Sequence, residues 1–212
     1  MRPARSVRPP ASGSGRGTLT GLALPLLLVV AVVTGASGQE RVEGDRYTNP
    51  GYGIQIDKPA RWHFITAATV LALAQRAAGV PAKTDPDPVK TAGFAVIISK
   101  VPTLGRDFDP QVVVLVQEAP RTPTDLVAAC EQLRSGMSEP EAVRPPQRIE
   151  VDGKPAVRLD FAGYVDGAPV RASALCAFRD RRAYFVVAQA LSSGYDAEAT
   201  TFDTILQSFH LR

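Results

Sequence analysis

The sequence predicts an α+β fold in which an antiparallel β-sheet is flanked by helices, as in an α/β/α sandwich. Three observations predict it. The last third of the chain alternates polar and apolar residues between turn signals, which indicates a meander of antiparallel strands. Two continuous β-branched runs precede the meander and indicate buried strands. Segments with one apolar stripe at helical spacing lie around these strands, and each stripe has to be buried against the sheet.

The first predicted strand is "YGIQIDKP", residues 52–59, which follows a turn signal at 49–51. Side chains alternate along a strand, so Ile54 and Ile56 fall on one face and indicate that this strand is half-buried. Pro59 cannot donate a hydrogen bond to a neighbouring strand and therefore ends it.

Two further strands and a helix are predicted in the middle of the chain. Residues 66–79 are rich in Ala and Leu and end in Gly, which predicts a helix. The apolar runs at 94–101 and 111–119 are rich in β-branched residues and predict buried strands. The segments 80–93 and 104–110 show no periodicity and are expected to form loops.

Residues 121–137 carry the signals of a second helix. Thr122 can cap it, Pro123 suits its first position, and Asp125 is favourable in its first turn. The Pro-rich segment 138–147 is expected to be a connector. The apolar stripe of this helix consists of Leu126, Cys130, Leu133 and Met137.

Four strands are predicted as a meander over residues 148–191. Asp-Gly pairs at 152–153 and 166–167 are strong hairpin signals, and a third turn is expected at 180–182. Asp196 is expected to cap a final helix. The stripe of that helix consists of Phe202, Ile205, Leu206 and Phe209.

The N-terminal segment has the pattern of an export signal. A basic stretch comes first, then an apolar run at 19–33, and small residues at Ala36 and Gly38 suit a cut before Gln39. The apolar run is short for a membrane span and contains Pro25, which favours cleavage, although an uncleaved signal anchor stays an alternative. No Cys follows the run closely, so a lipid anchor has no attachment residue.

These boundaries predict three parts: a signal peptide or signal anchor at 1–38, a polar linker at 39–46, and a single domain at 47–212. The formal charge of +3 comes from four arginines in the first part, and the remainder has 20 basic and 21 acidic residues. The folded part therefore has no basic excess of the kind that binds nucleic acid. With either kind of signal, the domain is expected outside the cytoplasm, either periplasmic or secreted.

The motifs resemble those of the PsbP-like superfamily, which includes PsbP, bacterial DcrB-like envelope proteins and mycobacterial proteins of the LpqN and LpqT type. "GYGIQIDKPARW" provides an aromatic residue at Tyr52, then a strand, Pro59 and Trp62. A meander follows, and "FDTILQSF" at 202–209 closes the pattern. The resemblance covers residues 47–211. It implies a PsbP-like α/β sandwich, an extracytoplasmic location and no catalytic residues, since members mostly bind or scaffold.

Trp62 is the only tryptophan of the chain, and it has two interpretations. It anchors the hydrophobic core, or it forms a stacking platform for a ring-shaped ligand. Its position just after Pro59, together with the resemblance, favours the core.

Residues that could support catalysis or metal binding lack companions in the sequence. His63 and His210 are the only histidines, and neither has the spacing of a metal or catalytic motif. There is no Gly-x-Ser-x-Gly motif and no Gly-rich cofactor loop. Loop carboxylates could bind calcium, but adjacent prolines favour ordinary rigid turns. These carboxylates are Asp85, Asp87, Asp107 and Asp109. No cofactor, metal or catalytic residue is therefore expected.

Two residue pairs remain as candidates for structural or binding roles. Cys130 and Cys176 either form a disulfide, which an exported chain permits, or are two small buried hydrophobic residues. Arg181 and Arg182, with Arg179, make a basic hairpin tip that either contacts a partner or is simply solvated.

Three functions follow in order of preference. The first is a non-catalytic extracytoplasmic module that binds or scaffolds a protein partner of the cell envelope. The second is a carrier of a small ligand or metal ion that uses a cleft at the sheet edge. The third is an enzyme whose carboxylates the sequence does not single out. Membrane contact is expected only through an uncleaved N-terminal segment, and no nucleic acid is expected as a partner.

Overall fold

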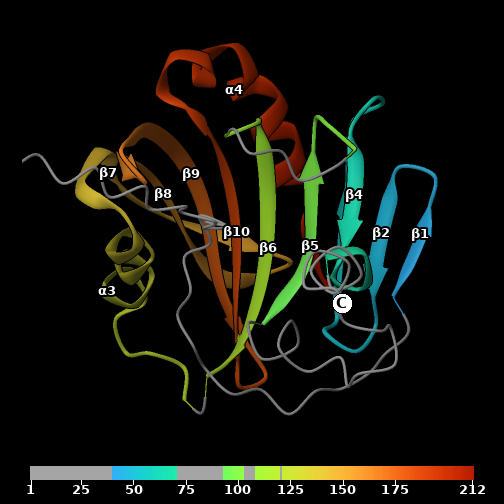
Figure 1. The fold of residues 1–212 in the computed structure, drawn as a ribbon. Helices are drawn as coiled ribbons and strands as arrows, with labels where there is room; N and C mark the ends of the chain where they lie inside the picture. The colour runs from blue at the N-terminus through green and yellow to red at the C-terminus, as the bar shows by residue number, and fades with distance from the viewer. Residues whose placement is uncertain (1–39, 71–92, 103–107, 120) are drawn as a thin grey trace, which may run out of the picture.

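Two antiparallel sheets form the frame of the computed structural model, which describes residues 40–70, 93–102, 108–119 and 121–212 (Figure 1). The small sheet has four strands in the order β1-β2-β3-β11. Its strands are β1 (Arg41–Glu43), β2 (Arg46–Asn49), β3 (Ile54–Asp57) and β11 (His210–Leu211).

The large sheet has seven strands in the order β4-β5-β6-β10-β9-β8-β7, and all of its pairs are antiparallel. Its second half is a plain meander, because β7 to β10 are neighbours both in sequence and in the sheet. The strands are β4 (His63–Thr66), β5 (Phe94–Ser99), β6 (Gln111–Glu118), β7 (Ser138–Val151), β8 (Lys154–Val165), β9 (Ala168–Arg179) and β10 (Arg182–Leu191).

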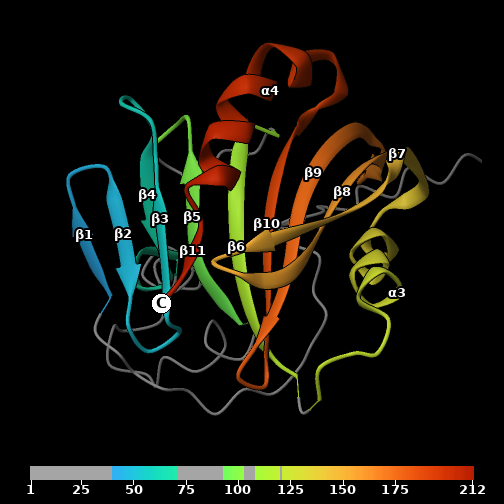
Figure 2. The ribbon, with the colours of Figure 1, turned by 180° about the vertical axis from the view of Figure 1, so that it is seen from behind.

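Both faces of the large sheet are covered. The helix α4 (Ser192–Gln207) and the small sheet pack on one face, where they bury one hydrophobic cluster (Figure 2). The short helix α3 (Leu126–Glu131), followed by a 3₁₀ turn at Gln132–Gly136, packs on the other face over a second cluster. The predicted α+β class is confirmed. The sequence did not predict that a second, smaller sheet would pack beside α4 on one face of the large sheet. Among the described residues no helix is long and apolar enough to cross a membrane.

The predicted meander turns adopt the backbone that tight hairpins need. Both central residues of each turn have positive φ, as at Asp152 (48°) and Gly153 (71°). This is the twist of type I′ turns, and it matches the right-handed twist of the strands on either side. The third turn is shorter than predicted, because only Asp180 and Arg181 have positive φ and Arg182 already begins β10.

The predicted connector at 138–147 is wrong, because these residues form most of β7. Their prolines suggested a connector, yet a strand at the edge of a sheet needs hydrogen-bond donors on one side only. β7 is such an edge strand, and its pairing with β8 shifts register between Ser138 and Gln147. A Pro-rich segment can therefore still extend the sheet.

The predicted linker at 39–46 also needs correction, because β1 and the start of β2 lie within it. β1 has three exposed residues, so no apolar pattern marks it. Its backbone pairs with β2, where Val42 lies opposite Tyr47. Backbone hydrogen bonds can add a polar edge strand to a sheet without any side-chain signal.

Two helix starts differ from prediction. Asp125, and not Thr122, caps α3, since its carboxylate accepts hydrogen bonds from the backbone N–H groups of Val127 and Ala128. α4 begins at Ser192, so Asp196 lies inside the helix and not at its cap. Asp196 instead pairs with Arg171 at 2.8 Å.

The short strands β4 and β11 were also missed, because two to four residues carry too little periodicity to be recognised. The helix predicted at 66–79 begins at residue 67, and its part beyond residue 70 lies outside the described residues. The predicted signal segment at 1–38 lies outside them as well.

Candidate functional site

A cavity of about 320 Å³ lies between the end of the β7–β8 hairpin and the C-terminal end of α4, two elements that Figure 2 shows close together beside β11. Its volume is at the lower end of the range found for small-molecule sites. The hairpin contributes residues 149–152. The apolar wall on the other side consists of Leu175, Leu206 and Phe209.

Asp152 and His210 form a polar clasp at one end of this cavity. One carboxylate oxygen of Asp152 lies 2.9 Å from Nδ1 of His210, and the other accepts a hydrogen bond of 2.6 Å from the backbone N–H of Leu211. The hairpin turn therefore holds β11 in place. Burial alone would raise the pKa of the Asp152 carboxyl, but the hydrogen bonds from His210 and Leu211 outweigh it and lower this pKa.

We expect Asp152→Asn to change how stability depends on pH. A carboxyl whose pKa is lower in the folded state stabilises the fold above its unfolded pKa of about 3.9, and this contribution is lost as the pH falls through the folded pKa. Asn keeps the turn, because it also tolerates positive φ. Denaturant unfolding at pH 7 should therefore show the variant less stable than the wild type, and the gap should close below about pH 4. A gap that is constant from pH 7 to pH 3 would refute a role for the charge.

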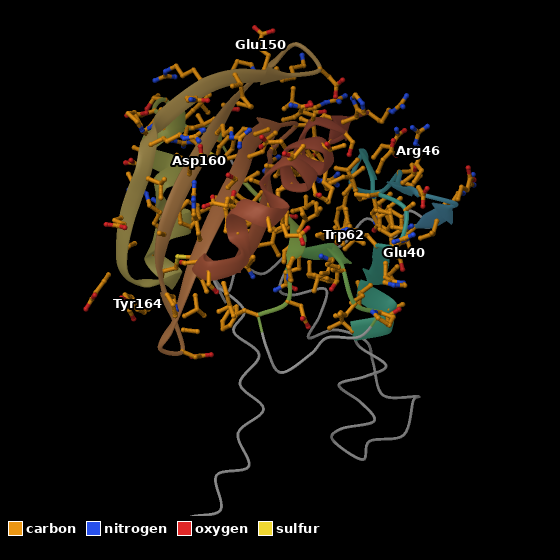
Figure 3. All side chains as sticks on the ribbon, turned by 90° about the horizontal axis from the view of Figure 1, so that it is seen from above. Glu40, Arg46, Trp62, Glu150, Asp160 and Tyr164 are labelled. Carbon is orange, nitrogen blue, oxygen red and sulfur yellow. A yellow bond between two sulfur atoms is a disulfide. The ribbon has the colours of Figure 1, made fainter. Side chains whose placement is uncertain are left out.

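Arg158 lies in the wall of the cavity within a network of acidic residues. Its Nη2 donates to Asp203 on α4 at 2.6 Å and lies 3.5 Å from the carboxylate of Asp160. Burial by itself would lower the pKa of Arg158, but these two carboxylates raise it, so the guanidinium stays charged. Asp160, which is 8% exposed, also accepts a hydrogen bond from Ser173, and Figure 3 places it on the meander beside α4.

The hydrogen bonds around Ser173 connect elements of the fold to one another. Tyr195 on α4 donates to the Ser173 hydroxyl at 2.6 Å, and burial raises the pKa of this tyrosine. Ser173 is 2% exposed, so its hydroxyl cannot meet a substrate. The network therefore joins α4 to β8 and β9. The group of this network that lines the cavity is the Arg158 guanidinium, whose positive charge is compensated by Asp203 and Asp160.

Trp62 lies in the core between the small sheet and α4. Its side chain is 6% exposed, and its ring meets Phe202 edge-on, with ring centroids 6.1 Å apart and planes at 80° (Figure 3). Cys130 on α3 and Cys176 on β9 are joined in a disulfide, with Cα atoms 5.9 Å apart. Both cysteines are fully buried.

Arg181 and Arg182 have different surroundings at the β9–β10 tip. Arg182 is half-buried, donates to the carbonyl oxygen of Gly51 at 2.7 Å and lies over the ring of Tyr52, 5.9 Å from its centroid. It therefore ties the β2–β3 turn to the large sheet. Arg181 is exposed, and its backbone carbonyl accepts a hydrogen bond from Ala119. Of the two arginines, Arg181 is the one whose side chain faces solvent.

Substitution separates the two arginines. We expect Arg182→Ala to lower the free energy of unfolding by about 1–2 kcal/mol, since it removes a charged hydrogen bond to Gly51 and the contact with Tyr52. Arg181→Ala should change it by less than about 0.5 kcal/mol, because the side chain is exposed. Urea unfolding of both variants tests this difference, and equal losses would contradict it.

The remaining candidates from the sequence are not drawn together. His63 is exposed on β4, the opposite edge strand of the large sheet from β7, while His210 lies on the small sheet. Asp109 is half-buried, and Asp85, Asp87 and Asp107 lie outside the described residues. Within the described ranges, no three His, Cys, Asp or Glu side chains are grouped closely enough to hold a metal ion.

Sequence reasoning missed the residues that polarise the cavity. Asp152 was identified only as a turn residue, and its partner His210 lies 58 positions later. Arg158 and Asp160 did leave a signal, because they lie two positions apart on one face of a strand whose other residues from 155 to 163 carry no charge. Such a charged pair inside a buried meander predicts an ionic network beneath a helix.

The fold is similar to that of solved structures, although no known protein-family profile and no curated protein sequence matches the chain. The solution structure of cyanobacterial PsbP (CyanoP) from Synechocystis sp. PCC 6803 has a TM-score of 0.53 and 16% identity, and covers 81% of this chain and 98% of its own. The chain has a PsbP-like fold. The resemblance predicted from the sequence motifs is thus confirmed at the level of the fold.

A second match is the crystal structure of LpqN, which is involved in cell envelope biogenesis of Mycobacterium tuberculosis. Its TM-score is 0.46 at 12% identity, and the match covers 74% of this chain and 82% of LpqN. A third is a protein of unknown function from Pseudomonas aeruginosa, with a TM-score of 0.39, 11% identity and coverage of 54% and 89%.

Proposed function

We propose that the chain is a non-catalytic, extracytoplasmic module of the cell envelope that binds or scaffolds a protein partner. The export pattern at 1–38 supports the location. The disulfide between Cys130 and Cys176 supports it too, because structural disulfides persist mainly in oxidising compartments. The predicted resemblance to the PsbP-like superfamily also implies an extracytoplasmic location.

The observation that supports a binding role is that the partly buried charged side chains form hydrogen bonds between elements of the fold. Arg182 holds the β2–β3 turn, Asp152 holds β11, and Arg158 with Asp203 holds α4. A catalytic group needs a free face toward a substrate together with a companion that tunes it. Here the companions join one element of the fold to another, which supports a scaffold that presents its surface.

The test is capture from the native cell envelope. A photo-crosslinking residue at Glu118, which is exposed and lies opposite Arg182 beside the tip, should capture one protein in high yield while leaving Arg181 in place. Arg181→Glu should reduce co-purification of that protein several-fold, whereas Arg41→Glu on the exposed β1 strand should leave it unchanged. Equal capture by wild type and Arg181→Glu would refute the tip as the contact. If crosslinking at the tip captures no protein and a pull-down with the whole exported chain also recovers none, the partner-binding function is refuted.

The cavity favours a second candidate, a carrier of a small ligand at the sheet edge. It lies beside the edge strand β7 and combines an apolar wall with polar groups at its ends. Native mass spectrometry of the exported protein tests this function. A retained mass that Ile149→Trp removes would support it, because Ile149 lies in the wall. A protein that carries no mass and is unaffected by the substitution would contradict it.

A further inference from the structure

The cavity meets the backbone of the edge strand β7. It contacts three consecutive residues of that strand, 149–151. Successive side chains of a strand point to opposite faces, so a cavity that contacts three in a row also touches the backbone between them. In Figure 3 the side chain of Glu150 points away from α4, so its main chain is the part that faces the cavity.

The hydrogen-bonding groups of this backbone point away from the sheet. Glu150 lies opposite Pro155 of β8, and a proline has no N–H to donate. In an antiparallel ladder, pairs that exchange hydrogen bonds alternate with pairs that do not, so Glu150 belongs to the second kind. Its N–H and C=O therefore face outward, as do those of Arg148 two residues earlier. β7 is the last strand of its sheet, so these groups have no strand partner among the described residues.

Prolines limit where this edge is open. Pro140, Pro145 and Pro146 interrupt the earlier part of β7, and proline is a common way for proteins to protect an exposed edge from pairing. Residues 147–151 contain no proline. The unprotected stretch is thus the one that runs beside the cavity.

We propose that this open edge binds an extended segment of a protein partner by strand addition, with one apolar side chain of that segment placed in the cavity. The inference rests on the proposed partner-binding function and gives it a contact surface separate from the Arg181 tip. In strand addition, backbone hydrogen bonds supply affinity and a pocket for alternate side chains supplies specificity. Leu175, Leu206 and Phe209 provide such a pocket.

The cavity also restricts the charge of the inserted side chain. Arg158 already pairs with Asp203 and Asp160, and Asp160 also lies 4.0 Å from Arg144, so two positive and two negative groups balance and a further anion would add a negative charge without a partner. A cation would meet the positive guanidinium itself. An uncharged aliphatic side chain opposite Ile149 fits both the balance of charge and the apolar wall.

The outer face of β7 predicts the neighbouring residues of the partner. Arg148 and Glu150 are exposed there, and neither has an ion-pair partner among the described residues. Opposite charges directly across two strands stabilise their pairing. An antiparallel partner segment should therefore present, from its N-terminus, a basic residue opposite Glu150, an aliphatic residue opposite Ile149 and an acidic residue opposite Arg148. The expected core motif is Lys-Leu-Glu.

A capped peptide with Lys-Leu-Glu between threonines tests the motif, with the isotope-labelled exported chain observed by NMR. Titration should shift the backbone amides of Arg148 and Glu150 first. The reversed order, Glu-Leu-Lys, should bind at least about threefold more weakly, because both cross-strand charge pairs become unfavourable. Replacing the peptide Leu with Asp should abolish binding. Equal binding of all three peptides would overturn the inference.

Two matched changes isolate the backbone contact. Glu150→Pro removes the outward N–H while leaving the β8 ladder intact, because Glu150 exchanges no hydrogen bond with Pro155. Glu150→Gln removes only the charge. The first should abolish binding and the second should weaken it a few-fold. If Glu150→Pro does not fold, a peptide N-methylated at the residue opposite Glu150 makes the same test on the ligand. Undiminished binding of that peptide would refute strand addition.

Hydrogen exchange without peptide tests other occupants of the edge. If another part of this chain or a second copy covers β7, the amides of Arg148 and Glu150 will already be protected. Protection that rises with protein concentration would indicate a second copy, and either result would overturn the partner assignment. The envelope capture experiment is independent of these outcomes. A captured protein with no peptide binding would therefore refute the edge site and leave the binding function standing.

Discussion

Trp62→Ala is expected to lower the free energy of unfolding by about 3–5 kcal/mol, the usual cost of removing a large aromatic side chain from a core. Trp62 is 6% exposed and contacts Phe202 edge-on, so its loss opens a cavity between α4 and the small sheet. A typical domain has a total margin of only about 5–15 kcal/mol. The variant should therefore lose a large share of this margin.

Tyr164→Ala is the matched control for this prediction. Tyr164 is also an aromatic residue of the described fold, but its side chain is 43% exposed. Its truncation should cost less than about 1 kcal/mol. Urea denaturation followed by circular dichroism measures both variants. A loss below about 1 kcal/mol for Trp62→Ala would show that this ring contributes little to the stability of the core. The interpretation of Trp62 as a platform for a ligand would then be open again.

The parts of the fold that the sequence predicts well depend on local information. The Asp-Gly turns at 152–153 and 166–167 determine their own backbone, because few other residue pairs tolerate positive φ at both positions. The stripe on α4 is equally local, and Phe202 and Ile205 are both buried as expected. An α+β sandwich could thus be predicted from turns, strand periodicity and one helix stripe, whereas its PsbP-like character was implied only by the resemblance of its motifs.

The parts that the sequence does not predict depend on neighbours that are distant in the chain. The sequence of β7 resembles a connector because of its prolines. It forms a strand because it pairs with β8 on one side and lies at the sheet edge on the other, where proline is tolerated. Arg182 resembles any solvated arginine, and its role becomes clear only when Gly51, 131 positions away, lies beside it. Asp152 likewise becomes the clasp of β11 only through His210. The candidate site is built from these distant pairs, so it is absent from any local pattern.

The disulfide between Cys130 and Cys176 is expected to contribute about 4 kcal/mol, since it closes a loop with a sequence separation of 46 in the unfolded chain. Local forces do little to hold α3 in place. It has six residues, and isolated helices shorter than about 12 residues are marginal in water. The bridge joins α3 to β9 within the second hydrophobic cluster. The same bond therefore lowers the conformational entropy of the unfolded chain and holds α3 against one face of the large sheet.

Replacing both cysteines by Ala should therefore lower the free energy of unfolding by about 4 kcal/mol relative to the oxidised wild type. Reductant should destabilise the wild type by a similar amount and leave the double variant unchanged, which separates the bond from the packing of the sulfur atoms. Counting thiols in the denatured, unreduced chain provides the direct check. Two reactive thiols there would show that the cysteines of the exported protein are free. The cover formed by α3 would then depend on packing of Cys130 and its neighbours alone.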